Sequence, residues 1–356
     1  GPKGFKETPT LKRSNAFDEV AKEVNAVRTG VGLLDISGFS RYEVSGPKAE
    51  AWLDRMMSTK LPKSGRARLA VMLAPNGKLK GDLTLLNWGD GTYWLMGSYY
   101  LREWHMRWFH DRLEDGVDVR DISDATVGFA VVGPKSREVL ASLTHQDVSH
   151  AALPFMGCQT IDLGLIRAKV ARMSVCGELG YEINCSAAEH ISLREILLKA
   201  GAELGIREFG FYAMNSLRLE KSFGVWSAEF RQEYTPGETG MDRWIDWQKA
   251  GFAGREAALA ERDGKTAAKV LVTLEVEAEN ADASGYEPVW QGDKRVGYVS
   301  SGGYGHHVQK SLALALVDPA CAAEGIELDI HVVGVRRKAR VIPPSPYDPS
   351  GLVMRR

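Results

Sequence analysis

A lone carboxylate in an otherwise apolar hairpin is the first candidate for chemistry in this sequence. Residues 76–85 read NGKLKGDLTL, and Asp82 lies in the strand that follows an Asn-Gly turn. Asn and Gly tolerate the positive φ that a tight reversal needs. Strand alternation then puts Leu83 and Leu85 on one face, with Asp82 and Thr84 on the other.

A second reversal at Gly89-Asp90-Gly91 returns the chain through the apolar residues 93–96. Asp82 is therefore predicted on an inner strand of a meander, where an ionised carboxylate must find hydrogen-bond donors or a ligand. The alternative is an aspartate on an edge strand that faces water.

A second carboxylate follows two glycines in the stretch CGELGYEI, residues 176–183. Glu182 alternates with Tyr181 and Ile183, so its side chain is predicted to point away from theirs. Two inward carboxylates could accept hydrogen bonds from a planar amino-amide edge, as a protein that recognises a pterin or guanine ring does. The alternative is a surface glutamate on a half-exposed strand.

A third candidate is the helical stretch NSLRLEK, residues 215–221. Asn215, Arg218 and Lys221 recur at one-turn spacing and share a helical face. The guanidinium of Arg218 could bind a carboxylate with its bidentate fork. A salt-bridged face in solvent explains the pattern equally well.

Composition excludes several other classes of function. The formal net charge of -1 over 356 residues gives no electrostatic reason for nucleic-acid or membrane binding. Neither a membrane-length apolar run nor a signal peptide is present, and the four cysteines lack C-x-x-C spacing, which favours free thiols in a reducing cytoplasm. His306 and His307 are adjacent rather than at ligand spacing, so no metal site is expected.

Dinucleotide and flavin sites are not expected on this chain either. The stretch 302–305, GGYG, is flanked by predicted strands, whereas a dinucleotide site requires a following helix, so it is interpreted as a bend in a barrel. The chain begins with Gly1-Pro2 rather than Met, which is typical of a protease remnant and suggests a piece excised from a longer protein.

An internal repeat organises the first half of the chain. Residues 42–56 (YEVSGPKAEAWLDRM) and 129–143 (FAVVGPKSREVLASL) each predict a strand, a Gly-Pro-Lys turn and a helix with Pro at its first position. Chance similarity of two such joints is the alternative. The runs that follow predict strands at 66–74, 81–88, 92–97, 157–163, 165–174 and 180–185, with helices near 99–114 and 187–203.

The strand-helix-strand-strand-helix order, present twice, predicts an α+β fold with two pseudo-duplicated ferredoxin-like halves that share a core. From Lys269 onward, short strands with turn breaks predict a C-terminal antiparallel β-barrel. The expected boundaries are 1–120 for the first half, 121–262 for the second half with a helix and an aromatic loop, and 263–356 for the barrel.

Together these motifs resemble the aminomethyltransferase family, the folate-binding T-proteins of the glycine cleavage system and their relatives. The resemblance runs nearly end to end and is carried by VRTGVGLLDIS (27–37), NGKLKGDL (76–83), GELGYEI (177–183), SLRLE (216–220), SGG (301–303) and KSLA (310–313). The stretches GFSRYEVSGP, NSLRLEKSFGVW and SSGGYGHHVQKSLAL are most similar to the C-terminal half of dimethylglycine dehydrogenase, sarcosine dehydrogenase and dimethylglycine oxidase.

The resemblance implies tetrahydrofolate-dependent capture of a one-carbon unit, from a small methylated amine or its iminium, as 5,10-methylenetetrahydrofolate. FAD would reside on an upstream domain or a flavoprotein partner that performs the oxidation. Two alternatives stay open: a tetrahydrofolate-dependent S- or O-demethylase that moves an intact methyl group, and a folate-binding or assembly protein without catalysis.

The resemblance also implies a role for each site residue. Asp82 would be catalytic, orienting N10 of tetrahydrofolate and handling a proton there. The expected folate-binding residues are Thr84 and Gly97 along the pterin slot, Glu182 at the pterin amino and N3 protons, Tyr181 beside it, and Arg218 and Trp226 at the mouth near the aminobenzoate and glutamate tail.

Overall fold

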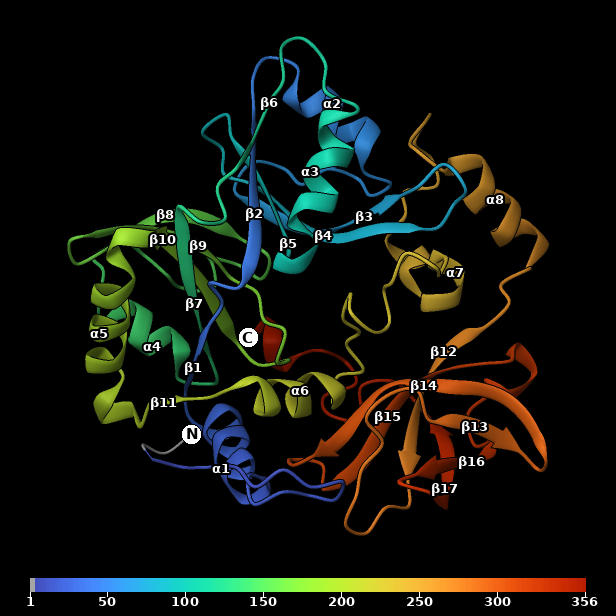
Figure 1. Cartoon of the computed structure of the whole chain (residues 1–356). Helices are drawn as coiled ribbons and strands as arrows, with labels where there is room; N and C mark the ends of the chain where they lie inside the picture. The colour runs from blue at the N-terminus through green and yellow to red at the C-terminus, as the bar shows by residue number, and fades with distance from the viewer. Residues whose placement is uncertain (1–3) are drawn as a thin grey trace.

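Two open sheets and one closed barrel make up the described part of the chain, residues 4–356 of the computed structural model (Figure 1). Gly1-Pro2, interpreted above as a protease remnant, lies outside the described residues. The arrangement confirms the predicted α+β class with a C-terminal antiparallel barrel.

The first sheet has the strand order β3-β4-β5-β2-β6, and all its pairs are antiparallel. Its strands are β2 (Phe39–Ser45), β3 (Arg66–Leu73), β4 (Leu79–Asn87), β5 (Tyr93–Ser98) and β6 (Asp118–Asp121). Helices α2 (Ala49–Met56) and α3 (Arg102–His110), the latter after the short helix η1 (Tyr99–Leu101), pack on one face. The shared core includes Tyr42, Trp52, Leu83, Leu85, Leu95 and Phe109.

The second sheet has the order β11-β1-β7-β10-β9-β8, in which only β1 and β11 pair in parallel. Its strands are β1 (Gly32–Asp35), β7 (Thr126–Val132), β8 (Cys158–Leu163), β9 (Ile166–Ala171), β10 (Gly180–Ser186) and β11 (Arg207–Glu208). Its helices are α4 (Ser136–Ala141), η2 (Ala187–Glu189), α5 (His190–Ala200) and η3 (Ala202–Leu204).

One segment lies with a different half from the one predicted. Helix α1 (Phe17–Thr29) and strand β1 fall within the range 1–120 that the sequence assigned to the first half. The structure instead pairs β1 with β7 of the second sheet and buries Leu33 in the core of that sheet. The pairing of β1 with β7 and the burial of its apolar side chains therefore determine which sheet it joins, not its position along the chain.

The two predicted Gly-Pro-Lys joints have the same geometry in both halves. Gly46 and Gly133 adopt positive φ, and a Cβ atom on either would lie 2.5 Å from a backbone carbonyl oxygen. The expected position of the prolines at the first residue of the helices is wrong. Pro47 and Pro134 lie in a turn, closed by an i+3 hydrogen bond from Ala49 and its equivalent in the second half, before α2 and α4 begin.

The barrel closes because β12 pairs with both β15 and β17. Its strands are β12 (Val270–Val276), β13 (Pro288–Gln291), β14 (Lys294–Gly305), β15 (Lys310–Val317), β16 (Glu327–Val332) and β17 (Val335–Ile342), with the short helices η5 (Pro319–Cys321) and η6 (Val353–Arg355). Gly302 lies inside β14, where a Cβ atom would meet the carbonyl oxygen of Ala283 at 2.4 Å. The segment 302–305, which was interpreted as a bend in the barrel, thus contains a glycine where two backbone segments approach closely.

Helix α6 (Phe211–Leu219) connects the second sheet to the barrel, and Figure 1 shows it between the two. The Asn215 side chain donates to the carbonyl oxygen of Gly302, and the Ser216 hydroxyl donates to that of Tyr304 at 2.8 Å. A loop with the helices α7 (Pro236–Thr239), η4 (Met241–Trp244) and α8 (Arg255–Gly264) then leads to β12.

All four cysteines are free, as predicted, and the structure buries all of them. None of the helices within residues 4–356 combines the length and apolar composition that crossing a bilayer requires. Over the same residues, no group of three or more His, Cys, Asp and Glu side chains is arranged to hold a metal ion.

Candidate folate site between the two sheets

Asp82 lies on the face of the first sheet that is turned toward the second sheet. The strand β4 alternates as predicted: Leu83 and Leu85 pack under the helices, while Asp82 and Thr84 point to the other face. Leu86, next on that face, packs in a cluster that joins the two sheets. The other members of the cluster are Ala67, Trp88, Trp94 and Met96 from the first half and Cys158, Ala171 and Met173 from the second.

Glu182 lies on the matching face of the second sheet. In β10 it is flanked by Ala130 of β7 and Ala171 of β9, and Ala171 belongs to the cluster between the sheets. The Glu182 residue is only 7% exposed. The two predicted carboxylates thus stand on the faces that the two sheets turn toward each other.

Neither carboxylate is satisfied by other side chains of the described residues. No hydrogen-bond donor or cation within residues 4–356 contacts the Glu182 carboxylate. Within the same range, the Asp82 carboxylate receives a hydrogen bond only from its own backbone N–H. An acceptor that is shielded from water and has no donor is costly, so buried Glu182 and half-buried Asp82 are both suited to receive a ligand that brings hydrogen-bond donors.

Burial raises the pKa of both groups to about 7. The negative charge of Glu229 raises the pKa of Asp82 further, whereas the positive charge of Arg41 partly opposes the rise at Glu182. A carboxyl group with a pKa near neutrality exists in both protonation states at cellular pH. That property is what general acid–base catalysis requires.

The structure places Tyr181 on the opposite face from Glu182. Its ring lies in the core under α4 and α5, and its hydroxyl oxygen accepts a hydrogen bond from Arg137 at 3.1 Å. The expectation put Tyr181 beside Glu182 at the pterin, whereas alternation along β10 separates the two side chains by the thickness of the sheet.

Gly97 is required by packing behind the site. A Cβ atom on Gly97 would lie 2.5 Å from Cδ2 of Leu83, on the helix-covered face of the sheet. The glycine thus makes room for Leu83 rather than for a ring on the other face, where the slot was expected. Thr84 does lie on the Asp82 face, opposite Met96 of β5.

Arg218 is not at an open mouth but is buried, with 4% exposure. Its guanidinium donates to Asn215, to the carbonyl oxygen of Phe223 and to the carboxylate of Glu229. This geometry differs from both earlier interpretations of Arg218. One had its guanidinium free to bind a ligand carboxylate, and the other put it on a salt-bridged face in solvent. Ser301 of the barrel donates to the same Glu229 carboxylate at 2.6 Å, so Arg218 and Glu229 join α6, the loop and the barrel.

Trp226 is likewise buried rather than exposed at a mouth. Its ring contacts that of His105 edge-on, with 6.3 Å between centroids, in a cluster that joins β3 and β4 to the loop after α6. Trp226 therefore helps to fix that loop, which carries Glu229, against the strand of Asp82.

Three residues near the candidate carboxylates were not predicted from the sequence: Arg41, Asn184 and Glu229. Arg41 and Asn184 are charged and polar residues inside strands, the same signal that singled out Asp82, and Arg41 donates to Oδ1 of Asn184 at 2.9 Å across the two sheets. Glu229 lies in an irregular loop, where nothing in the sequence indicated burial.

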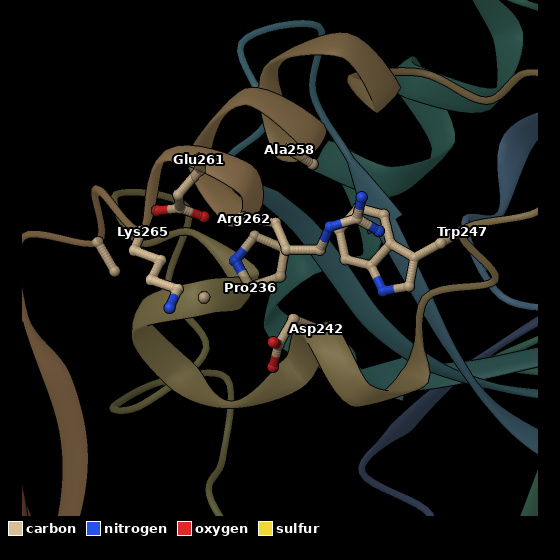
Figure 2. A pocket seen from close by; sticks show the side chains of 9 residues that line it. Pro236, Asp242, Trp247, Ala258, Glu261, Arg262 and Lys265 are labelled. Carbon is tan, nitrogen blue, oxygen red and sulfur yellow. The ribbon is translucent and has the colours of Figure 1, made fainter.

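A cavity of about 160 Å³ beside α7 and α8 contains none of the predicted site residues. Figure 2 shows its lining, in which Arg262 reaches across the cavity toward the ring of Trp247 and the Asp242 side chain lies below the other labelled residues. This cavity is separate from the facing carboxylates.

Comparison with known proteins assigns the fold. Residues 1–249 match the model of the GCVT N-terminal domain, and residues 269–348 match that of the glycine cleavage T-protein C-terminal barrel domain. Aminomethyltransferase of Geobacillus sp. (strain WCH70) is 30% identical over 92% of this chain and 90% of its own length. The chain belongs to the aminomethyltransferase family.

Other relatives within this family extend beyond the chain. Rat mitochondrial dimethylglycine dehydrogenase is 32% identical over 94% of this chain, which spans only 39% of that protein. Among solved structures, the aminomethyltransferase T of the glycine cleavage system from Bartonella henselae superposes with a TM-score of 0.84 at 23% identity. It covers 97% of this chain and 95% of its own, so the whole three-part architecture is shared.

Proposed function

We propose that this chain transfers a one-carbon unit to tetrahydrofolate, forming 5,10-methylenetetrahydrofolate from the iminium that a flavoprotein domain or partner makes by oxidising a small methylated amine. The observation that carries the proposal is a pair of carboxylates, half-buried Asp82 and buried Glu182, which stand on the inner faces of the two sheets without side-chain donors among the described residues. Family membership supports the same activity.

Tetrahydrofolate, when bound, supplies the two nitrogens that take up the carbon. In this proposal the ionised carboxylate of Glu182 accepts hydrogen bonds from the amino group and N3–H of the pterin, a charge-assisted pair that fixes the ring. Asp82 orients N10 and exchanges a proton there, which its pKa of about 7 suits. Thr84 lines the same face, and Arg218 and Trp226 act indirectly by holding the loop of Glu229.

We further propose that the chain works as the folate part of a flavin-linked N-demethylase. The support is the name and length of the rat dimethylglycine dehydrogenase, of which this chain matches 39%. FAD would then be held by another domain or by a partner protein, and four free buried thiols are typical of a reducing compartment such as the cytoplasm. Flavin absorbance of the product of the intact gene, compared with this chain, tests the proposal.

The transfer itself is tested with tetrahydrofolate and a formaldehyde or iminium donor. Asp82→Asn keeps the shape of the side chain but cannot exchange the proton, so the catalysed rate should fall about a hundredfold to ten-thousandfold. Asp115→Asn, at an exposed aspartate, is the matched control and should keep the wild-type rate. Analysis of the product as methylene- or methyltetrahydrofolate separates this activity from intact methyl transfer.

Equal rates in wild type and Asp82→Asn, both above the uncatalysed background, would contradict the catalytic role. Folate binding without any acceleration in the wild type would instead favour a folate-binding or assembly protein.

A further inference from the structure

The buried guanidinium of Arg41 stands beside Glu182 at the contact between the two sheets. Arg41 belongs to β2 of the first sheet and is fully buried. Because Tyr42 points into the core under the helices, strand alternation directs Arg41 to the other face, toward the second sheet.

The side chain of Arg41 is held in place by hydrogen bonds from all three guanidinium nitrogens. Nε donates to Oδ1 of Asn184 at 2.9 Å, Nη2 to the carbonyl oxygen of Ile36 at 2.9 Å, and Nη1 to that of Phe39 at 2.9 Å. Asn184 is two residues from Glu182 on the same face of β10, and it is also buried. The charge of Arg41 is therefore fixed next to the carboxylate of Glu182 without forming a direct ion pair with it.

Other neighbours of Glu182 are a thiol and the methyl groups of two alanines. Ala130 and Ala171 flank it on the neighbouring strands, and the Cys176 thiol lies near it in the preceding loop. Burial raises the pKa of that thiol to about 12, so it carries no charge at neutral pH. Arg41 is thus the cation that acts on Glu182 among the described residues.

Two other acidic groups also interact electrostatically with Arg41. Asp35 of β1, which is hydrogen-bonded to His190, and the thiol of Cys185 both interact with the guanidinium. The Asp35 carboxyl has its pKa lowered by hydrogen bonds from Ser37 and His190, against the effect of burial. Asp35 therefore keeps its negative charge across the range in which Glu182 titrates.

We propose that Arg41 is a positioning residue of the folate site, the fixed counter-charge that favours the ionised form of Glu182, which accepts hydrogen bonds from the pterin donors. The proposal rests on the proposed function of Glu182. Asn184 contributes as well, because its Oδ1 atom accepts a hydrogen bond from the guanidinium and so holds it between the two sheets.

The test is the pH dependence of tetrahydrofolate affinity, measured by calorimetry from pH 6 to 9. An opposite charge nearby lowers the pKa of a carboxyl group by about one to three units, and the lower end is expected here because Arg41 and Glu182 form no direct ion pair. In Arg41→Gln the midpoint of the affinity profile should therefore move up by about one pH unit, with affinity about fivefold lower at pH 7 and less than about twofold lower at pH 9. Arg41→Lys, which keeps the charge, should restore the wild-type midpoint.

A purely structural role of Arg41 would lower affinity equally at every pH, and that result would overturn the proposal. Glu182→Gln combined with Arg41→Gln should show no such titration, because the titrating carboxyl group is gone. If Arg41→Gln does not fold, Asn184→Ala loosens the guanidinium and should move the midpoint in the same direction by a smaller amount.

Failure of the proposed function gives a different result. The carboxyl carbon of Glu182, identified in labelled protein by its absence from Glu182→Gln, can be titrated by NMR without any ligand. If the protein does not bind folate but the Glu182 pKa still rises in Arg41→Gln, the counter-charge role stands and the folate assignment fails. An unchanged Glu182 pKa in Arg41→Gln overturns the role itself.

Discussion

Replacement of Glu182 by Gln should stabilise the folded protein at high pH while weakening its ligand site. Burial raises the pKa of Glu182 from 4.5 to about 7, so the folded protein binds this proton more tightly than the unfolded chain does. The contribution of this group to stability is therefore highest below pH 4.5 and is lost as the pH rises toward 7. The difference of about 2.5 pH units corresponds to about 3 kcal/mol at pH 8, because each unit is worth about 1.4 kcal/mol.

The assay is urea unfolding of wild type and Glu182→Gln at pH 5 and pH 8. The difference in free energy of unfolding between the two proteins should shift by about 2 to 3 kcal/mol in favour of the variant on going from pH 5 to pH 8. Taking the change between two pH values removes whatever the amide itself contributes to packing. Glu203→Gln, at an exposed glutamate, should show no such shift.

If the difference in free energy of unfolding is the same at pH 5 and pH 8, Glu182 titrates alike in the folded and unfolded protein, and burial does not raise its pKa. The carboxylate would then be in contact with water or with a donor, and its availability for a ligand would lose its physical basis.

Two further substitutions test the framework around the site. Arg218→Met should destabilise the protein by about 3 to 5 kcal/mol in urea unfolding, because it leaves Glu229 buried without a cation, and Glu229→Gln added to it should recover part of the loss. Gly97→Ala should cost about 1 to 3 kcal/mol by crowding Leu83, whereas Gly38→Ala, with open space around it, should be nearly neutral. Equal effects at the two glycines, or no effect at Arg218, would contradict these packing assignments.

Local pattern and turn chemistry were enough to predict most of the fold. The alternation that separates Asp82 from Leu83, the paired Gly-Pro joints and the short strands of the barrel are all properties of neighbouring residues. The attachment of β1 to the second sheet was not predictable in this way, because strand pairing is decided by contacts between residues far apart in sequence.

In the candidate site, too, features set by neighbouring residues could be predicted, and features set by distant contacts could not. Asp82 and Glu182 were found because a carboxylate in an apolar strand is locally conspicuous, and the structure puts both on the facing sides of the sheets. The side chains of Tyr181, Arg218 and Trp226 were misplaced, since a family motif indicates that a residue matters without giving the direction of its side chain. For Tyr181, strand alternation already predicted a side chain pointing away from Glu182, whereas the family motif put it beside Glu182, and the structure agrees with the alternation.

The proposed folate site is best tested by the binding of tetrahydrofolate, measured by titration calorimetry at pH 8 under anaerobic conditions. We expect saturable binding of one ligand per chain, weakened in Glu182→Gln by about 1 to 3 kcal/mol because the pterin donors lose a charged acceptor. The exposed-site control Glu203→Gln should bind like wild type. No saturable binding to demonstrably folded protein, or equal affinity in wild type and Glu182→Gln, would contradict it.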